Sequence, residues 1–381
     1  MCGARYDVVI LGGGPAGCAT ALALHQAAAG RLLVVEASRM DAVRVGESIP
    51  PDTRLLLERL GLWTDFAREG HETCLGSCSA WGDAELGYND FLFNPLGAGW
   101  HLDRRRFDAL LARTVAARGI ELRTATRCAR VEPAADGFRL ALAAGGGGAE
   151  SIVARFVVDA TGMGALFARG LGAVRHLHDQ LICAVGFLAL PPSSSFSQLT
   201  LLEAEELGWW YAARLPDQRL AVAFASDLDL LRSAGLETAE RWLARLVATR
   251  HLGPAVAGCR LLDDRLHLRP APSCRLDRAA GDGWLAVGDA AAAFDPLSAQ
   301  GIHKALAGGI QAAEATAAAL TGDARQLGAY PAAVVSGFDD YLANRNHFYQ
   351  VETRWPDAPF WRRRRERSGL RPLPIRGSAG R

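Results

Sequence analysis

The stretch that decides the fold is Tyr6-Asp-Val-Val-Ile-Leu11, followed directly by Gly12-Gly-Gly-Pro-Ala-Gly17. The apolar run is too short for a helix and ends at glycine, which predicts a buried parallel strand. Glycines at positions 12, 14 and 17 permit a tight turn, close approach of a pyrophosphate and close packing of the next helix, expected over 16–26. Residues 31–36 predict a second strand, and Glu36 ends it where a carboxylate can accept hydrogen bonds from ribose hydroxyls. This order predicts a β-α-β unit that binds a dinucleotide.

A second signal lies far downstream, at Gly288-Asp289 and in the loop from Pro296 to Gly301. Asp289 follows an expected strand and is placed to hydrogen-bond the ribityl chain of a flavin. The helix expected over 301–320 would direct its N-terminal amides at the pyrimidine end of the isoalloxazine and stabilise the anionic reduced ring. Enzymes that bind NAD do not need this second element, and we find no second Gly-x-Gly-x-x-Gly unit for a stably bound nicotinamide. The pair of motifs therefore predicts FAD.

The composition is that of an ordinary globular protein. Of the 381 residues, 50% are hydrophobic and 22% charged, and the formal net charge of +1 provides no global field for nucleic acid. The eight cysteines lack metal-site spacing, so we expect reduced thiols and no bound metal. No apolar run reaches transmembrane length, and a strand that starts by residue 6 leaves no room for a signal peptide. These features predict a cytoplasmic protein with no nucleic-acid partner and no membrane span.

The predicted fold class is α/β. It comprises a Rossmann-like FAD-binding domain of the GR2 type, an inserted antiparallel-sheet substrate domain and a C-terminal helical segment. Helices are expected at 50–60, 104–118 and 236–249, a strand at 121–131, and a hairpin of 138–142 with 152–158 around the glycines at 145–148. The FAD domain is expected to be discontinuous, over 1–60, 95–165 and 275–325, with the substrate domain over 61–94 and 166–274. Residues 326–381 would form a helical region and a basic tail, frayed from Trp361 onward.

Five stretches together resemble the para-hydroxybenzoate-hydroxylase fold group: Gly12–Gly17, Val45–Pro51, Gly99–Arg104, Asp159–Gly162 and Gly288–Ile302. They are most similar to the branch that contains flavin-dependent tryptophan halogenases and geranylgeranyl reductases, and the resemblance covers roughly residues 5–320. The motifs and the resemblance imply a set of FAD contacts. These are Gly12, Gly14, Pro15, Ala16, Gly17, Glu36, Ala37, Ser48, Arg104, Arg130, Val131, Asp159, Gly288, Asp289, Pro296, Gln300, Gly301 and Ile302.

Within that branch, halogenases need a lysine after Gly-Glu-Ser and a Trp-x-Trp-x-Ile-Pro stretch. The chain has one lysine, Lys304, and residues 49–103 contain none. In place of Trp-x-Trp-x-Ile-Pro, this chain reads Gly208-Trp-Trp-Tyr-Ala-Ala-Arg-Leu-Pro216.

Three short segments, Cys78–Gly82, Gly99–Arg104 and Phe294–Leu297, are more similar to a sister family of flavoprotein monooxygenases. Members of that family hydroxylate protein-bound tryptophan in tryptophylquinone cofactor biogenesis.

The resemblance implies an FAD-dependent monooxygenase in which a flavin C4a-hydroperoxide hydroxylates an aromatic substrate, tryptophan or indole, free or within a peptide or protein. NAD(P)H or a separate flavin reductase would supply electrons. The polar residues expected near the flavin, as candidate catalytic groups, are Glu47, Ser48, Asp295 and His303. The rings expected to stack on the substrate are Trp81, Trp100, Trp210 and Tyr211.

Several of these residues also have a structural interpretation. Trp210 and Tyr211 lie in an expected strand and could equally be core residues instead of substrate contacts. His303 could equally be a structural histidine, and Asp295 could cap a turn. Three alternative functions stay open. One is a flavin-dependent halogenase, and another is a reductase of isoprenoid double bonds, which the charges in the middle block disfavour. The third is an accessory protein that binds flavin without turnover.

Overall fold

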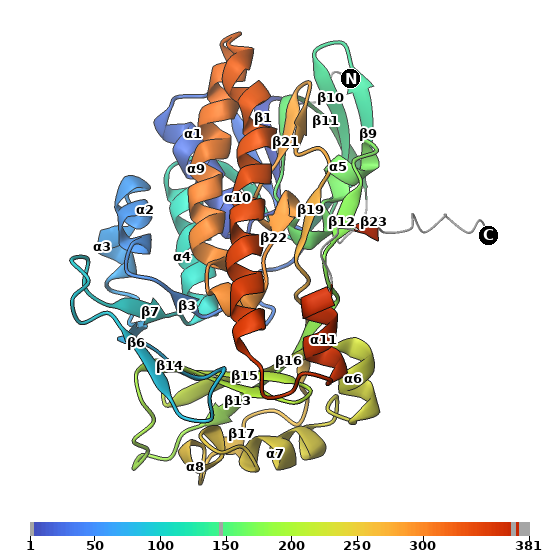
Figure 1. The fold of residues 1–381 in the computed structure, drawn as a ribbon. Helices are drawn as coiled ribbons and strands as arrows, with labels where there is room; N and C mark the ends of the chain where they lie inside the picture. The colour runs from blue at the N-terminus through green and yellow to red at the C-terminus, as the bar shows by residue number, and fades with distance from the viewer. Residues whose placement is uncertain (1–3, 145–147, 367–370, 373–381) are drawn as a thin grey trace.

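The computed structural model describes residues 4–144, 148–366 and 371–372 (Figure 1). Its first sheet is built on β1 (Arg5–Leu11), which lies between β2 (Leu32–Val35) and β11 (Ala149–Asp159), and both neighbours run parallel to it. The helix α1 (Pro15–Gln26) connects β1 to β2, which confirms the predicted β-α-β unit. The strand order is β20-β21-β11-β1-β2-β8, in which β20 is Ala280–Gly281, β21 is Trp284–Ala286 and β8 is Glu121–Arg123. β21 therefore lies directly beside β11 although the chain reaches it much later.

Two long helices pack over α1 on one side of this sheet. The helix α9 (Gly301–Leu320) contacts α1, and α10 (Ala324–Val351) packs on α9 (Figure 1). The contact of α9 with α1 is close because Gly309 has no side chain: a Cβ there would lie 2.7 Å from Cβ of Ala19. This packing brings the second motif, at the start of α9, beside the glycine turn that precedes α1.

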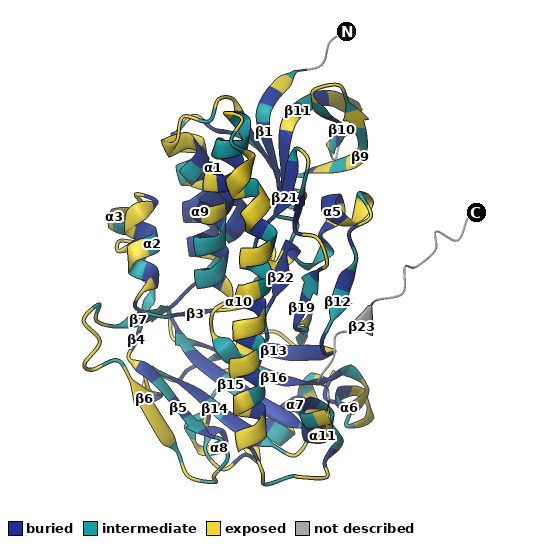
Figure 2. Cartoon of the chain, turned by 45° about the horizontal axis from the view of Figure 1, so that its top comes forward, coloured by how far each residue is buried: buried dark blue, intermediate teal, exposed yellow. Residues whose placement is uncertain are grey.

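The second large sheet lies below the first in Figure 1 and has the order β17-β13-β16-β15-β14-β5-β6, in which β17 is Arg260–Leu261 and β5 is Gly76–Ala80. Its main strands are antiparallel, as predicted: β13 (Leu181–Ala189), β14 (Leu199–Glu205), β15 (Gly208–Leu215) and β16 (Arg219–Asp227). One face packs on residues that include Trp242 of α7 (Ala239–Val247), and the other packs on the C-terminal helices. The edge strand β6 (Gly87–Asp90) is exposed (Figure 2).

The domain boundaries stay a prediction, but the structure shows how the range 61–94 is divided. Leu62 and Phe66 belong to the core of the first sheet, whereas β5 (Gly76–Ala80) pairs with β14 in the second sheet. A small sheet lies between the two, formed by β3 (Ser48–Ile49), β7 (Gly99–His101) and β4 (Glu72–Cys74).

Three expectations about local structure need correction. The strand expected at 121–131 is broken at Ala125, whose φ of 49° is left-handed, into β8 (Glu121–Arg123) and β9 (Thr126–Ala134). The helix expected from residue 50 begins at Thr53, as α2 (Thr53–Arg59), because prolines occupy positions 50 and 51. The prediction that the tail frays from Trp361 onward is wrong for its first residues. They belong to α11 (Pro359–Glu366), in which Phe360 and Trp361 are completely buried.

The expected hairpin is confirmed as β10 (Gly137–Ala144) paired with β11, and residues 145–147 of its loop lie outside the described chain. The described cysteines are free thiols, and Cys2 is outside that part. No helix among the described residues is long and apolar enough to cross a membrane. No grouping of three or more His, Cys, Asp or Glu that could hold a metal ion occurs in the part of the chain that is described.

Candidate active site

A cavity of about 1130 Å³ lies where the glycine turn, the start of α9 and the antiparallel sheet meet. Most residues expected to contact FAD line it. They are Gly12, Gly14, Pro15, Ala16, Glu36, Ala37, Ser48, Arg104, Arg130, Val131, Asp289, Pro296, Gly301 and Ile302. The two sequence motifs therefore line one cavity although more than 270 residues separate them.

The glycine turn has the backbone that a pyrophosphate site requires. Gly12 has a φ of 113°, and a Cβ there would lie 2.1 Å from the carbonyl oxygen of Ala160. Gly14 is the N-cap of α1 and has no side chain to cap it, so the first amides of the helix are free to meet a ligand. This arrangement fits the pyrophosphate of FAD.

Glu36 is held as an ionised carboxylate at the edge of this turn. Its Oε2 accepts a hydrogen bond from the Gly13 amide at 2.7 Å, and its Oε1 accepts from the amide and hydroxyl of Ser38 at 2.8 and 2.6 Å. Burial alone would raise the pKa of Glu36, but the hydrogen bonds from Ser38 and Gly13 and the charge of Arg44 together lower it. Glu36 thus both fixes the turn and presents negative charge to the cavity.

Arg44 is a cavity residue that the sequence does not single out. Its Nε lies 3.3 Å from Oδ2 of Asp108, and its Nη1 lies 3.6 Å from where a Cβ on Gly14 would be. The guanidinium is therefore beside the phosphate-binding turn. The available signal was an arginine two residues before Gly46-Glu47-Ser48, in a loop without periodic pattern.

Four of the expected FAD contacts do not line the cavity: Gly17, Asp159, Gly288 and Gln300. The carboxylate of Asp159 is buried and accepts hydrogen bonds from Thr161 N and Oγ1, at 3.0 and 2.6 Å, and from Ala168 N, at 2.8 Å. Asp159 therefore holds the turn after β11. Gly17 and Gly288 permit close packing, since a Cβ would lie 1.9 Å from Gly12 O and 2.7 Å from Ala16 Cβ, respectively.

The only lysine of the chain is held beside the cavity and does not line it. Lys304 Nζ donates to Asp289 Oδ1 at 2.8 Å and to the carbonyl of Ala292, and it lies 4.2 Å from the ring centroid of Phe294. Asp289 itself lines the cavity. The amine is therefore held by Asp289 and by the carbonyl of Ala292.

Glu47 is the cavity residue best suited to exchange a proton. It is buried, and its Oε1 has no hydrogen-bond partner among the described residues. Burial raises the pKa of Glu47 to about 7, although the nearby Arg104 guanidinium opposes the shift. Glu47 can therefore hold or release a proton near neutral pH.

Ser48 begins a chain of hydrogen bonds that leads from the cavity into the protein. Its Oγ lies 2.8 Å from Tyr211 Oη and 3.1 Å from Thr200 Oγ1, and Thr200 Oγ1 lies 2.8 Å from His101 Nε2. Burial lowers the pKa of His101 to about 4, so the imidazole is neutral at physiological pH. The chain fixes the Tyr211 hydroxyl at the cavity wall.

The other two catalytic candidates differ from each other in position. Asp295 lines the cavity and is fully buried, and its Oδ1 caps the amide of Leu297 at 2.9 Å. Burial raises the pKa of Asp295, and the Arg345 guanidinium opposes that shift. His303 does not line the cavity: its Nδ1 is 3.1 Å from Thr53 Oγ1, a contact that joins α9 to α2.

Of the four expected substrate rings, only Tyr211 lines the cavity. Trp210 faces the opposite side of β15 and packs on Trp242, because successive residues of a strand point to opposite faces. Trp100 packs on Trp63 and Phe66 in the first core. Trp81 contacts Trp209, Tyr349 and Trp361 from behind the cavity wall.

Trp209, the neighbour of Trp210 in β15, is the tryptophan of this strand that lines the cavity. It shares a face of β15 with Tyr211, and both side chains line the cavity. The signal for it was present in the pair Trp209-Trp210, but the sequence does not show which of two adjacent tryptophans faces the sheet side that carries the cavity.

The paired flavin motifs, their shared cavity and the sheet that covers it define an FAD-dependent enzyme. The sequence profile of the tryptophan halogenase family matches residues 7–92 and 87–373, so the chain belongs to that family. A relative from Marinomonas mediterranea, the putative FAD-dependent oxidoreductase LodB, is 29% identical over 366 residues, which are 96% of this chain and 98% of LodB.

Two solved structures show the range of chemistry on this fold. The flavin-dependent halogenase CmlS matches with a TM-score of 0.85 and 25% identity, over 96% of this chain and 68% of its own. The peptidyl tryptophan dihydroxylase QhpG, described as essential for tryptophylquinone cofactor biogenesis, matches with a TM-score of 0.76 and 26% identity, over 95% of this chain and 79% of its own.

Proposed function

We propose that this protein is a monooxygenase that hydroxylates an aromatic substrate, a tryptophan or indole carried by a peptide or protein. The observation that carries the proposal is the absence of a lysine from the described cavity wall, together with the binding of Lys304 to Asp289. The resemblance implies that a halogenase needs a lysine after Gly-Glu-Ser, and this chain has none between residues 49 and 103. Oxygen transfer to an electron-rich ring requires no such amine.

The cavity residues have distinct roles in this proposal. Reduced FAD, when bound, supplies the two electrons that activate O2. One oxygen atom enters a ring C–H bond, the other leaves as water, and the ring proton passes to a base. We assign this role to Glu47 at Oε1, because its pKa is near 7 and it lines the cavity. Trp209 and Tyr211 provide an aromatic wall for the substrate ring.

The name of one relative supports a macromolecular substrate. QhpG is named a peptidyl tryptophan dihydroxylase, and its fold covers almost the whole of this chain. LodB, which matches end to end, is named an oxidoreductase and not a halogenase. We further propose that electrons come from NAD(P)H, either directly or through a separate flavin reductase.

A second candidate function is halogenation. The family profile carries that name, and CmlS matches with a higher TM-score than QhpG. A halogenase of this sequence would have to orient its oxidant without the lysine that the resemblance implies, and Glu47, Ser48 and Tyr211 are among the polar groups of the wall that could do so. The two functions differ in the atom added to the ring, so one product analysis separates them.

The test uses purified FAD-loaded protein, a tryptophan-containing peptide, NADH, a flavin reductase and 18O2, with chloride and bromide present. Hydroxylation adds about 16 or 32 Da for one or two oxygen atoms, increased by the label. A chlorine or bromine isotope pattern would replace the proposal with the second candidate. A parallel reaction without reductase shows whether NADH reduces the protein directly. If every peptide and free tryptophan stays unmodified while the flavin is reoxidised, the proposed substrate class is wrong.

A further inference from the structure

Three residues of α10 converge on one residue of the cavity wall. Tyr341, Arg345 and Tyr349 are four residues apart, which places them on one face of the helix, and all three are buried. Tyr341 Oη accepts the amide of Asp295 at 2.6 Å. Arg345 Nε and Tyr349 Oη donate to Asp295 Oδ2 at 3.2 and 2.8 Å. The main chain and the side chain of Asp295 are thus both held by α10.

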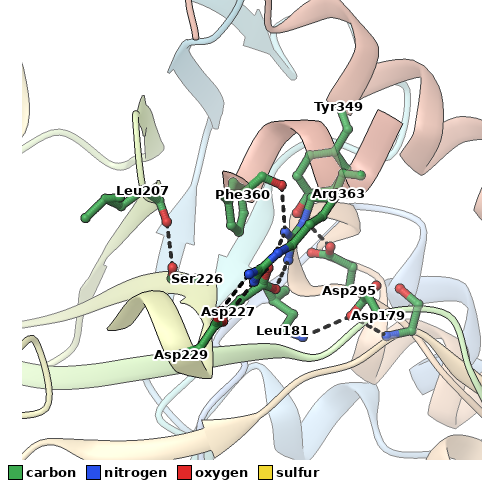
Figure 3. A network of polar contacts seen from close by, with 12 residues as sticks. Asp179, Leu181, Leu207, Ser226, Asp227, Asp229, Asp295, Tyr349, Phe360 and Arg363 are labelled. Carbon is green, nitrogen blue, oxygen red and sulfur yellow. Dashed lines mark hydrogen bonds and ion pairs between the residues drawn. The ribbon is translucent and has the colours of Figure 1, made fainter. Parts of the chain in front are cut away.

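Asp295 begins the loop that the second motif directs at the flavin. Its Oδ1 caps the turn at Pro296–Ser298, and Pro296, Ala299 and Gly301 of the same loop line the cavity. Because the loop leads without interruption into α9, a change in the position of Asp295 moves the residues next to the cofactor site. Figure 3 shows Asp295 beside Tyr349 and Asp179 in this network.

Tyr349 has a second partner in the antiparallel sheet, on β15. Trp209 Nε1 lies 3.0 Å from Tyr349 Oη, and both residues are fully buried. An indole N–H can only donate, so the tyrosine oxygen accepts from Trp209 and its own hydrogen is directed to Asp295. The direction of both hydrogen bonds is therefore determined: Trp209 to Tyr349, and Tyr349 to Asp295.

Ion pairs within the protein surround this path. Arg345 Nη2 lies 2.7 Å from Asp179 Oδ2, so one guanidinium bridges two buried carboxylates. On the other side of Tyr349, Arg364 Nη2 of α11 pairs with Asp227 Oδ1 at 2.9 Å. Removing Arg345 would leave both carboxylates without this ion pair and destabilise the fold, whereas Asp227 also pairs with Arg363, at 2.9 Å. The neutral hydroxyl of Tyr349 is the member that can be removed without this effect.

We propose that Tyr349 is a positioning residue that couples the substrate wall, through Trp209, to the flavin-side loop, through Asp295. A substrate that contacts Trp209 changes the hydrogen bond from Trp209 to Tyr349, and with it the strength of the hydrogen bond that Tyr349 donates to Asp295. The negative charge that Asp295 presents to the cofactor changes as a result. Loss of the hydroxyl leaves the Asp295 carboxylate with one hydrogen bond fewer. Its less compensated negative charge then disfavours the added negative charge of a reduced flavin.

The experiment measures the midpoint potential and the visible absorption of the bound flavin in four FAD-loaded variants. Y349F removes the central hydroxyl, W209F removes the donor on the substrate side, and a third variant combines them. Y330F is the matched control, since Tyr330 lies on the same helix and its buried hydroxyl donates to Ala286 O at 2.9 Å, away from Asp295. The proposal expects a more negative potential in Y349F and a wild-type potential in Y330F.

The double variant tests the coupling itself. If Tyr349 transmits the effect of Trp209, the double variant shifts the potential no further than Y349F alone. Additive shifts of the midpoint potential would show that Trp209 acts on the flavin independently of Tyr349. Equal shifts in Y349F and Y330F would show that loss of any buried hydroxyl from α10 disturbs the flavin site. Each of these results overturns the proposal. If Y349F does not fold, W209F by itself tests the proposal, and a wild-type midpoint potential in W209F overturns it. No outcome depends on the product formed, so the proposed hydroxylation is tested separately.

Discussion

The hydroxyl of Tyr211 lies 2.8 Å from Oγ of Ser48, and this contact joins the antiparallel sheet to the loop that enters the flavin side of the cavity. Ser48 belongs to the Gly-Glu-Ser motif, and Tyr211 belongs to the strand that also carries Trp209. The antiparallel sheet and the Gly-Glu-Ser segment therefore meet at this hydrogen bond. Thr200 and His101 support that hydrogen bond from behind.

Replacing Thr200 by valine should disconnect this chain. T200V keeps the shape of the side chain but removes the oxygen that meets both Ser48 and His101, and it leaves the buried imidazole without its partner. We expect a loss of about 1–3 kcal/mol in unfolding free energy and a higher KM for the aromatic substrate. Urea unfolding and steady-state kinetics measure the two effects. T200S retains the hydroxyl and should restore both values, and a KM unchanged in T200V would contradict the role of the chain.

The pKa of Glu47 has a consequence for stability that E47Q should remove. Burial raises the pKa from 4.5 to about 7, so the folded protein binds one more proton than the unfolded chain between these values. The contribution of Glu47 to stability is therefore greatest below pH 4.5 and is lost as the pH rises to 7. At pH 8, E47Q should be more stable than the wild type by up to ~3 kcal/mol, with a much smaller difference at pH 5. Urea unfolding at both pH values tests this, and a difference independent of pH would argue against it.

E47Q should also lose activity. If Glu47 takes the ring proton, removal of its ionisable group should lower kcat by 10²–10⁴-fold, on the order expected for general base catalysis. The wild-type pH profile should rise as the pH increases through about 7, because the ionised form is the base. A variant that keeps the wild-type profile would show that another group accepts the proton.

Two adjacent glycines of α9 should respond in opposite ways to alanine. A Cβ on Gly309 would lie 2.7 Å from Cβ of Ala19 and 2.8 Å from the carbonyl of Ala16, so G309A should force α1 and α9 apart and weaken FAD binding. At Gly308 the nearest atom would be 3.8 Å away, and G308A should stabilise the helix by about 0.5–1 kcal/mol. Thermal unfolding and FAD titration compare the two variants. Similar behaviour of both would contradict the close contact.

Arg44 should contribute to FAD affinity through charge. R44Q removes the guanidinium beside Gly14, and we expect the Kd for FAD to rise about tenfold at low salt, with a smaller difference at high salt. R54Q is the control, because Arg54 is on α2 and pairs with Glu58 outside the cavity. Equal Kd values for R44Q and R54Q would show that Arg44 does not act on the cofactor.

The sequence was sufficient for features that depend on neighbours in the chain. The turn from Gly12 to Gly17 needs glycines because its backbone has left-handed φ and close contacts, and those requirements can be recognised from spacing alone. The helix after Gly301 and the strands around Asp159 follow from their apolar patterns in the same way. Pairing the two glycine motifs predicted a flavin cavity, and both motifs do line one cavity.

The tertiary structure alone decided which side chains face that cavity. Trp209 and Trp210 differ by one position in a strand, and the face each occupies depends on which side of the sheet the FAD domain covers. Tyr341, Arg345 and Tyr349 have a regular helical spacing, but their meeting with Asp295 depends on how α10 packs on a loop some fifty residues earlier. Local sequence patterns determine backbone conformation, whereas contacts between distant segments arise from packing that no single segment encodes.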